Sequence, residues 1–147
     1  MLNEIVKGIA VQLNAVFGDG FEIYQNNVEQ GLKEPCFFIA VLQPELSPLL
    51  GLRALKRNPF DIHYYPADPG DNVEMLDAAE RLMTGLEFIE LPDGEVLHGT
   101  AISYEMIDGV LHFFISFNSV IKRMKELPLM ETLETDVNPK KGSYNGS

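Results

Sequence analysis

The feature that most constrains the fold is the dipeptide Asp108-Gly109, which separates two strand-like runs in the segment SYEMIDGVLHFFISF, residues 103–117. Aspartate and glycine readily adopt the positive φ angles that a two-residue β-hairpin loop requires. The sequence therefore predicts an antiparallel hairpin that turns at these two residues.

This loop fixes which side chains lie opposite each other, because successive residues of a strand point to opposite faces of the sheet. One predicted face is a continuous apolar core, in which Met106, Tyr104 and Ile102 meet Leu111, Phe113 and Ile115. The other face is mixed and pairs Ile107 with Val110, Glu105 with His112, and Ser103 with Phe114. It is more apolar than a solvated face normally is, and this excess favours association between subunits.

Two segments have the apolar spacing of amphipathic helices. The first runs from Leu2 to about Phe17 and should end there, because the glycines at 18 and 20 favour the left-handed conformation common just past a helix. The second lies within residues 70–91, with Asp71 as its N-cap and Glu74 completing a capping box. Its expected buried stripe comprises Val73, Leu76, Ala79, Leu82, Met83 and Leu86.

Strand patterns occupy most of the remaining chain up to residue 122. They lie near residues 21–25, within 35–44, over 59–65, around 88–89, over about 95–107, and from 110 to near 122. The order α-β-β-β-α-β-β-β predicts an α+β fold. We expect an antiparallel or mixed sheet of five or six strands with two helices packed on one face.

The 147 residues fall within the usual size of one domain. We expect a single α+β domain over residues 1–125 and a partly disordered C-terminal tail over 126–147, rich in Gly, Ser, Asn and Pro. The sequence has no run of eighteen apolar residues and no signal-peptide pattern, so we expect a soluble, unexported protein without a membrane partner. Cys36, the single cysteine, lies among apolar residues and is expected to be a buried, unreactive thiol.

The charge balance argues against one class of partner. The chain has 22 acidic and 11 basic residues and a formal net charge of −11. Affinity for phosphate backbones depends on basic side chains that release counterions. We therefore expect no tight nucleic-acid binding, and an acidic surface suits a protein that lets DNA pass without holding it.

Motifs that carry chemistry are few. The sequence has no P-loop, no dinucleotide-binding glycine motif and no common zinc motif. His63 should share a strand face with Asp61, and His112 should lie opposite Glu105. Such carboxylate–imidazole pairs could serve acid–base catalysis, but they are also ordinary cross-strand partners. We favour the structural role, with no catalytic residue, no cofactor and no metal, because nothing in the spacing brings these two histidines and His98 together.

The segment Leu46 to Arg57 combines leucines with basic residues, while Pro48 and Gly51 prevent a long regular helix. It could be a surface loop whose leucines pack back onto the sheet. We prefer a protruding hairpin that docks on an acidic neighbour. The candidate subunit-interface residues are Leu49, Leu50, Leu52, Arg53, Lys56 and Arg57, together with Val110 and Phe114 on the mixed face of the sheet.

Three phrases carry a family resemblance: residues 1–39, NPFDIHYYP at 58–66 and YEMIDGVLHFF at 104–114. Together they resemble the tail terminator (tail completion) family encoded by phages and prophages of Gram-positive bacteria, over about residues 1–134. The resemblance implies a small structural protein that forms a homo-oligomeric ring, expected to be hexameric. This ring would cap the tail tube protein and present a surface to the head–tail connector protein. It implies assembly in the host cytoplasm and incorporation into the virion tail.

Two other classes of function remain open at this point. A head completion or connector protein would also form a ring, and its binding partner would distinguish it from a terminator. A small ligand-binding protein or enzyme would need a pocket with convergent polar groups, and the sequence does not reveal one.

Overall fold

The computed structural model describes residues 1–25 and 32–122 of the chain. The predicted boundary of the domain at residue 125 and the predicted tail at 126–147 lie outside the described residues. Contacts group the chain into two units. The larger unit comprises Met1–Ser47 and Leu55–Val120, and the smaller one includes Pro48–Ala54.

The structure confirms an α+β fold. The helices are α1 (Leu2–Phe17) and α2 (Asn72–Gly85). The strands are β1 (Glu22–Tyr24), β2 (Cys36–Val41), β3 (Glu45–Pro48), β4 (Arg53–Arg57), β5 (Pro59–Tyr65), β6 (Phe88–Glu90), β7 (Val96–Ile107), β8 (Val110–Phe117) and β9 (Ser119–Lys122). The six strands expected from the sequence correspond to β1, β2, β5, β6, β7 and β8.

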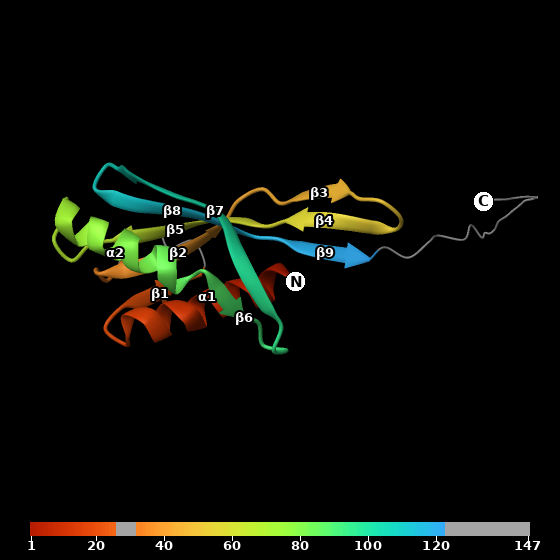
Figure 1. Cartoon of the computed structure of the whole chain (residues 1–147). Coiled ribbons are helices and arrows are strands. Elements are labelled where there is room, and N and C mark those ends of the chain that lie inside the picture. The colour runs from red at the N-terminus through yellow and green to blue at the C-terminus, as the bar shows by residue number, and fades with distance from the viewer. Residues whose placement is uncertain (26–31, 123–147) are drawn as a thin grey trace, which may run out of the picture. The chain divides into compact units, whose positions relative to one another are not determined.

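These six strands form a mixed sheet in the order β1-β2-β5-β8-β7-β6. β1 pairs with β2 in parallel, and every other neighbouring pair is antiparallel. Both helices lie on one face of this sheet, as predicted (Figure 1). The opposite face, which we call the outer face, carries the alternate residues of the central strands.

A second sheet has three strands in the order β3-β4-β9. The sequence did not predict this sheet, because the leucine-rich segment lacks a clear two-residue alternation. Two of its strands are separated from strands of the first sheet by a single residue: Asn58 lies between β4 and β5, and Asn118 lies between β8 and β9. The predicted last strand, from 110 to near 122, is therefore wrong as a single strand.

The first helix begins and ends where the sequence predicts. Gly18 follows it with a φ of 87°, and its amide donates to the carbonyl of Asn14. The helix approaches β6 closely at Gly8, where an added Cβ would lie 3.0 Å from the carbonyl oxygen of Glu90. A larger residue at position 8 would push the helix away from the sheet.

Asp71 caps the second helix, and its carboxylate accepts hydrogen bonds from the amides of Val73 and Glu74, each at 3.1 Å. The expected buried stripe is partly wrong, because the side chains of Val73, Leu76 and Met83 are exposed. The residues that are buried are Met75, Ala78, Ala79, Leu82 and Leu86. Two overlapping apolar stripes fit this helix equally well by spacing, and the sheet contacts only one of them.

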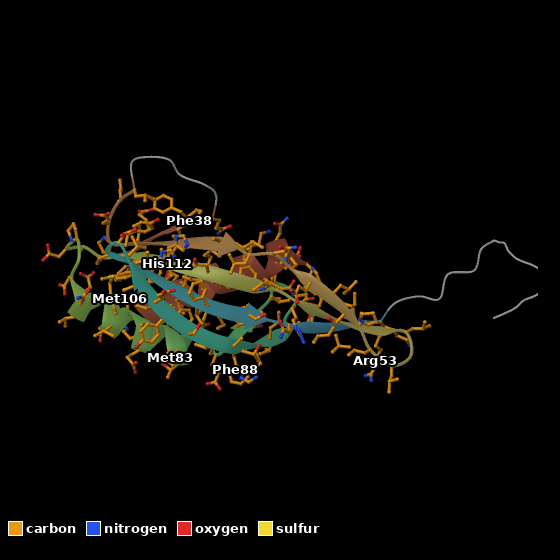
Figure 2. All side chains as sticks on the ribbon, turned by 90° about the horizontal axis from the view of Figure 1, so that it is seen from above. Phe38, Arg53, Met83, Phe88, Met106 and His112 are labelled. Atoms are coloured by element: carbon orange, nitrogen blue, oxygen red, sulfur yellow. The ribbon has the colours of Figure 1, made fainter. Side chains whose placement is uncertain are left out.

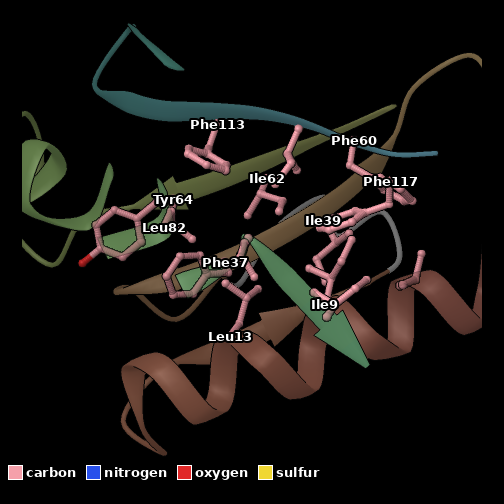
Figure 3. Close-up of a cluster of buried hydrophobic side chains, with 14 of the residues drawn as sticks. Ile9, Leu13, Phe37, Ile39, Phe60, Ile62, Tyr64, Leu82, Phe113 and Phe117 are labelled. Atoms are coloured by element: carbon pink, nitrogen blue, oxygen red, sulfur yellow. The ribbon is translucent and has the colours of Figure 1, made fainter. Parts of the chain in front are cut away.

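The core fills the space between the sheet and the two helices (Figure 3). Phe37, Ile62 and Phe113 project from the sheet toward Leu13 of α1 and Leu82 of α2, and all five are fully buried. The predicted place of Phe113 in the hairpin core, opposite Tyr104, is thereby confirmed.

The hairpin loop is confirmed, with φ angles of 52° at Asp108 and 78° at Gly109. The predicted pairs hold from Ile107–Val110 to Ser103–Phe114. The predicted pairing of Ile102 with Ile115 is wrong, because the register shifts between Thr100 and Ser103. Ala101 has a φ of 53° there, which is typical of a β-bulge that inserts a residue into one strand.

Candidate functional site

Polar and aromatic side chains meet on the outer face of the six-stranded sheet. Strand alternation places Phe38 of β2, His63 of β5 and His112 of β8 on this face, because their neighbours in sequence point into the core. Figure 2 shows Phe38 and His112 on this side of the molecule. The face is therefore neither fully polar nor fully apolar at its centre.

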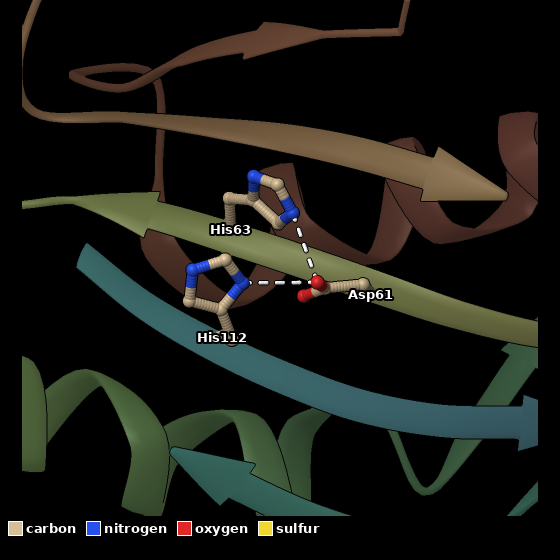
Figure 4. Close-up of polar contacts among 3 residues, drawn as sticks. All are labelled: Asp61, His63 and His112. Carbon is tan, nitrogen blue, oxygen red and sulfur yellow. Dashed lines mark hydrogen bonds and ion pairs between the residues drawn. The ribbon is translucent and has the colours of Figure 1, made fainter. Parts of the chain in front are cut away.

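Three of these side chains form a hydrogen-bonded cluster that Figure 4 shows. Nε2 of His63 lies 3.0 Å from Oδ2 of Asp61, and Nδ1 of His112 lies 2.9 Å from the same oxygen. His63 and His112 are direct cross-strand partners, and the centroids of their rings are 4.5 Å apart. One carboxylate oxygen thus accepts hydrogen bonds from two imidazoles on adjacent strands.

The carboxylate of the cluster is well buried for an acidic group, since Asp61 is only 8% exposed. Burial alone would raise its pKa, but the hydrogen bonds from His63 and His112 outweigh burial and hold the pKa of Asp61 below its ordinary value. Among the described residues, no donor reaches its other oxygen, Oδ1, although that atom is buried. The carboxylate is therefore ionised and only half satisfied.

The sequence predicted part of this arrangement. The pairing of Asp61 with His63 is confirmed. The register of His112 opposite Glu105 is also confirmed, but the imidazole hydrogen-bonds to Asp61 instead. The contact is diagonal across β5 and β8, and a sequence cannot show that these two strands are neighbours. His98 lies outside the cluster, 3.6 Å from a carboxylate oxygen of Glu87.

Aromatic rings lie beside both imidazoles of the cluster. The ring of Phe38 lies 5.5 Å and that of Tyr65 lies 6.3 Å from the ring of His63, and Phe114 lies 6.4 Å from His112. Two surface depressions of the structure lie elsewhere, along α1 on the helical face, lined by residues such as Lys7, Val11 and Ile23. The cluster therefore lies on an open sheet face with an apolar border.

Several predicted interface residues lie in the β3–β4 hairpin. Its turn contains Leu49, Leu50 and Leu52, whose side chains are 39%, 89% and 43% exposed. The amide of Leu49 donates to the carbonyl of Arg53 at 2.8 Å, which closes the turn. The three leucine side chains of this turn are thus exposed.

The basic residues of this hairpin differ in exposure. Arg53 and Arg57 are exposed, whereas Lys56 is half-buried. Val110 and Phe114 lie four residues apart on β8, on the outer face with His112, and are also half-buried. The structure thus brings the last two candidates together beside the histidine cluster.

Cys36 is fully buried, as predicted. Burial raises the pKa of its thiol to about 11, with smaller contributions from Glu34 and Glu22. At neutral pH the thiol is therefore protonated and a poor nucleophile.

No helix in the described part of the chain is long and apolar enough to cross a membrane.

Comparison with known proteins identifies the family. A sequence model described as "Phage tail terminator protein" matches residues 4–127. A search of curated proteins found no match. The matching family consists of structural phage tail proteins and is not an enzyme family. Because the match covers most of the chain, the protein belongs to the phage tail terminator family, with a structural role in tail completion and virion assembly.

Proposed function

We propose that this protein forms a homo-oligomeric ring of six copies that caps the head-proximal end of the phage tail tube and joins it to a head–tail connector protein. The observation that supports this most is the family match over residues 4–127. The ring would assemble in the cytoplasm of a Gram-positive host and then become part of the virion tail. Residues 1–125 would act as one domain in each copy, with 126–147 as a tail.

The β3–β4 hairpin supplies one side of the proposed contact between copies. Leu46, Leu49, Leu50 and Leu52 are all exposed in this hairpin, and exposed apolar residues that gather in one segment are typical of an interaction surface. Arg53 and Arg57 add positive charge to a chain with a net charge of −11. A basic hairpin of one copy and an acidic surface of the next are complementary, and such complementarity guides and orients assembly.

The outer face of the sheet is the second surface in the proposal. Val110 and Phe114 lie there, half-buried, among the aromatic rings around the histidine cluster. Interfaces are enriched in aromatic residues at their centres. If the hairpin does not carry the contact between copies, this face is the next candidate for it.

The test is charge reversal at the two exposed arginines. We expect Arg53→Glu with Arg57→Glu to abolish ring formation and tube capping, because like charges across an interface cost several kcal/mol. Both side chains are exposed, so the melting temperature should change little. Light scattering and negative-stain imaging, with tail tube protein present, measure the ring, and circular dichroism measures the fold.

A matched control reverses two exposed lysines elsewhere, Lys7 on α1 and Lys33 before β2. Lys7→Glu with Lys33→Glu changes the net charge by the same amount and should leave the ring intact. If the arginine variant still forms rings and caps tubes, the hairpin is only a surface loop. If both variants lose the ring equally, total charge rather than this hairpin governs assembly.

A further inference from the structure

The donor atoms of the Asp61 cluster suggest a function beyond the proposed ring. Within the described part of the chain, Asp61, His63 and His112 form one group in which three potential metal-ligand atoms lie within 4.8 Å of one another. We propose that these three residues bind one divalent transition-metal ion of the Zn²⁺ class on the outer face, between β5 and β8.

The donor distances are close to those of a metal site. The hydrogen-bonded separations of 3.0 and 2.9 Å between the imidazole nitrogens and Oδ2 of Asp61 need to widen only to about 3.4 Å for the tetrahedral angles that Zn²⁺ prefers with bonds of about 2.1 Å. Two such bonds span at most about 4.2 Å. The donor atoms lie within 4.8 Å of one another, so the widest pair must approach to about 3.4 Å, by rotation of an imidazole side chain, for both atoms to bind one tetrahedral ion.

The electrostatics also favour a cation. The carboxylate of Asp61 is only 8% exposed, and its buried Oδ1 has no donor among the described residues. A divalent ion would compensate this buried negative charge, and the free oxygen could become a second ligand. The unpartnered oxygen is evidence for a ligand that is independent of the spacing of the donors.

In the metal-free cluster, His63 donates from Nε2 and His112 donates from Nδ1 to the same oxygen. To bind the ion, each ring moves its proton to its other nitrogen and presents a lone pair. Glu105, the cross-strand partner of His112, lies in register to accept the relocated N–H of that ring.

The donor set selects the class of metal. Two imidazoles and a carboxylate suit Zn²⁺, Ni²⁺ and Co²⁺, whereas Mg²⁺ prefers oxygen ligands and water. The side chains of His63 and His112 are 19% and 20% exposed, so the ion can enter from solvent. The remaining coordination positions of the ion would point away from the sheet, toward water or a docked protein.

The experiment measures Zn²⁺ binding to the full chain by isothermal titration calorimetry and thermal melting. His63→Gln and His112→Gln each keep a hydrogen-bond donor for Asp61 but remove an imidazole ligand. His98→Gln is the matched control outside the cluster. We expect one Zn²⁺ per wild-type chain, a higher melting temperature with Zn²⁺, and no effect of Mg²⁺. Each cluster variant should bind about tenfold or more weakly, and the control should match the wild type.

A second readout uses only the unaltered protein, so it does not depend on the folding of the variants. Added Co²⁺ should shift or broaden the ring NMR signals of His63 and His112 and leave those of His98 unchanged. Three results would overturn the proposal: no Zn²⁺ binding by the wild type, equal affinity in all variants, or Co²⁺ effects centred on His98.

Discussion

The carboxylate of Glu74 links α2 to β5 and to the loop that follows β5. The hydroxyl of Tyr64 donates to Oε2 of Glu74, and the amide of Ala67 donates to the same oxygen at 2.9 Å. This explains why the expected capping box did not form. Glu74 is already engaged by these two donors, and the amide of Asp71 instead donates to the carbonyl of Asp68 at 3.0 Å.

We predict that Tyr64→Phe destabilises the protein by about 1.5 to 3 kcal/mol, the range for a hydrogen bond to a charged group. The ring remains to fill the core, since Tyr64 is only 3% exposed. Urea unfolding at neutral pH measures this change. A loss below about half a kcal/mol would show that the hydroxyl contact does not stabilise the fold.

The same variant tests a pH dependence. Burial, together with the hydrogen bond and negative charge of Glu74, raises the pKa of Tyr64 well above its ordinary value of about 10. A raised pKa means that the native state retains the proton after the unfolded state has lost it. The stabilisation by Tyr64 is therefore fully present below about pH 10 and is lost as the pH rises further. The wild type should lose stability more steeply above that pH than Tyr64→Phe, and a parallel loss in both proteins would contradict this.

At the scale of elements, two asparagines mark the places where strands leave the main sheet. Asn58 separates β4 from β5, and Asn118 separates β8 from β9. The backbone N–H of Asn58 donates to Oδ1 of Asn118 at 3.3 Å, and Nδ2 of the Asn58 side chain donates to the carbonyl of Phe117 at 3.0 Å. Asn58 is fully buried, and these bonds give partners to its N–H and to the carbonyl of Phe117 where the hydrogen bonding between strands is interrupted.

The β7–β8 hairpin supports a prediction about its two faces. Phe113 is fully buried in the core, and the next residue, Phe114, points to the outer face. Phe113→Ala should cost about 3 to 5 kcal/mol, because it loses transfer free energy and leaves a cavity. Phe114→Ala, the matched control, should cost clearly less in the isolated chain. Chemical unfolding of both variants measures the difference, and equal losses would mean that the outer face is covered in the free protein.

At the scale of the whole molecule, the net charge of −11 limits which partners can approach. Phosphate backbones and an acidic protein repel each other, and basic side chains are needed to release counterions. Among the candidate interface residues, Arg53 and Arg57 are exposed and positively charged, in contrast to the net negative charge of the chain. In the proposed ring they would face another copy rather than DNA.

We predict no measurable binding to duplex DNA near physiological salt. Fluorescence anisotropy with a labelled duplex tests this, and a salt titration distinguishes weak binding from none. Tight, salt-sensitive binding would contradict the prediction and would indicate that the basic side chains form a DNA-binding cluster despite the net charge.

The predictions made at short range in the sequence were the most accurate. Asp108-Gly109 fixed the hairpin turn, and alternation placed Asp61 and His63 on one face, because both features depend on only a few neighbouring residues. The predictions failed where a choice between equal local patterns was needed. Spacing allowed two buried stripes on α2, and only contact with the sheet decided between Met75 and Leu76.

The sequence by itself determined the two helices, the presence of the six strands of the main sheet, and the faces of β5 and of the hairpin between Ser103 and Phe114, because side-chain periodicity and turn residues act locally. Tertiary structure alone decided which strands are neighbours. It made β5 and β8 adjacent, and this adjacency brings His112 to Asp61 across 51 positions of the chain. It also ended β8 at Phe117 and placed β9 in a second sheet. Strand order depends on how the whole apolar surface is buried, which no short segment of sequence records.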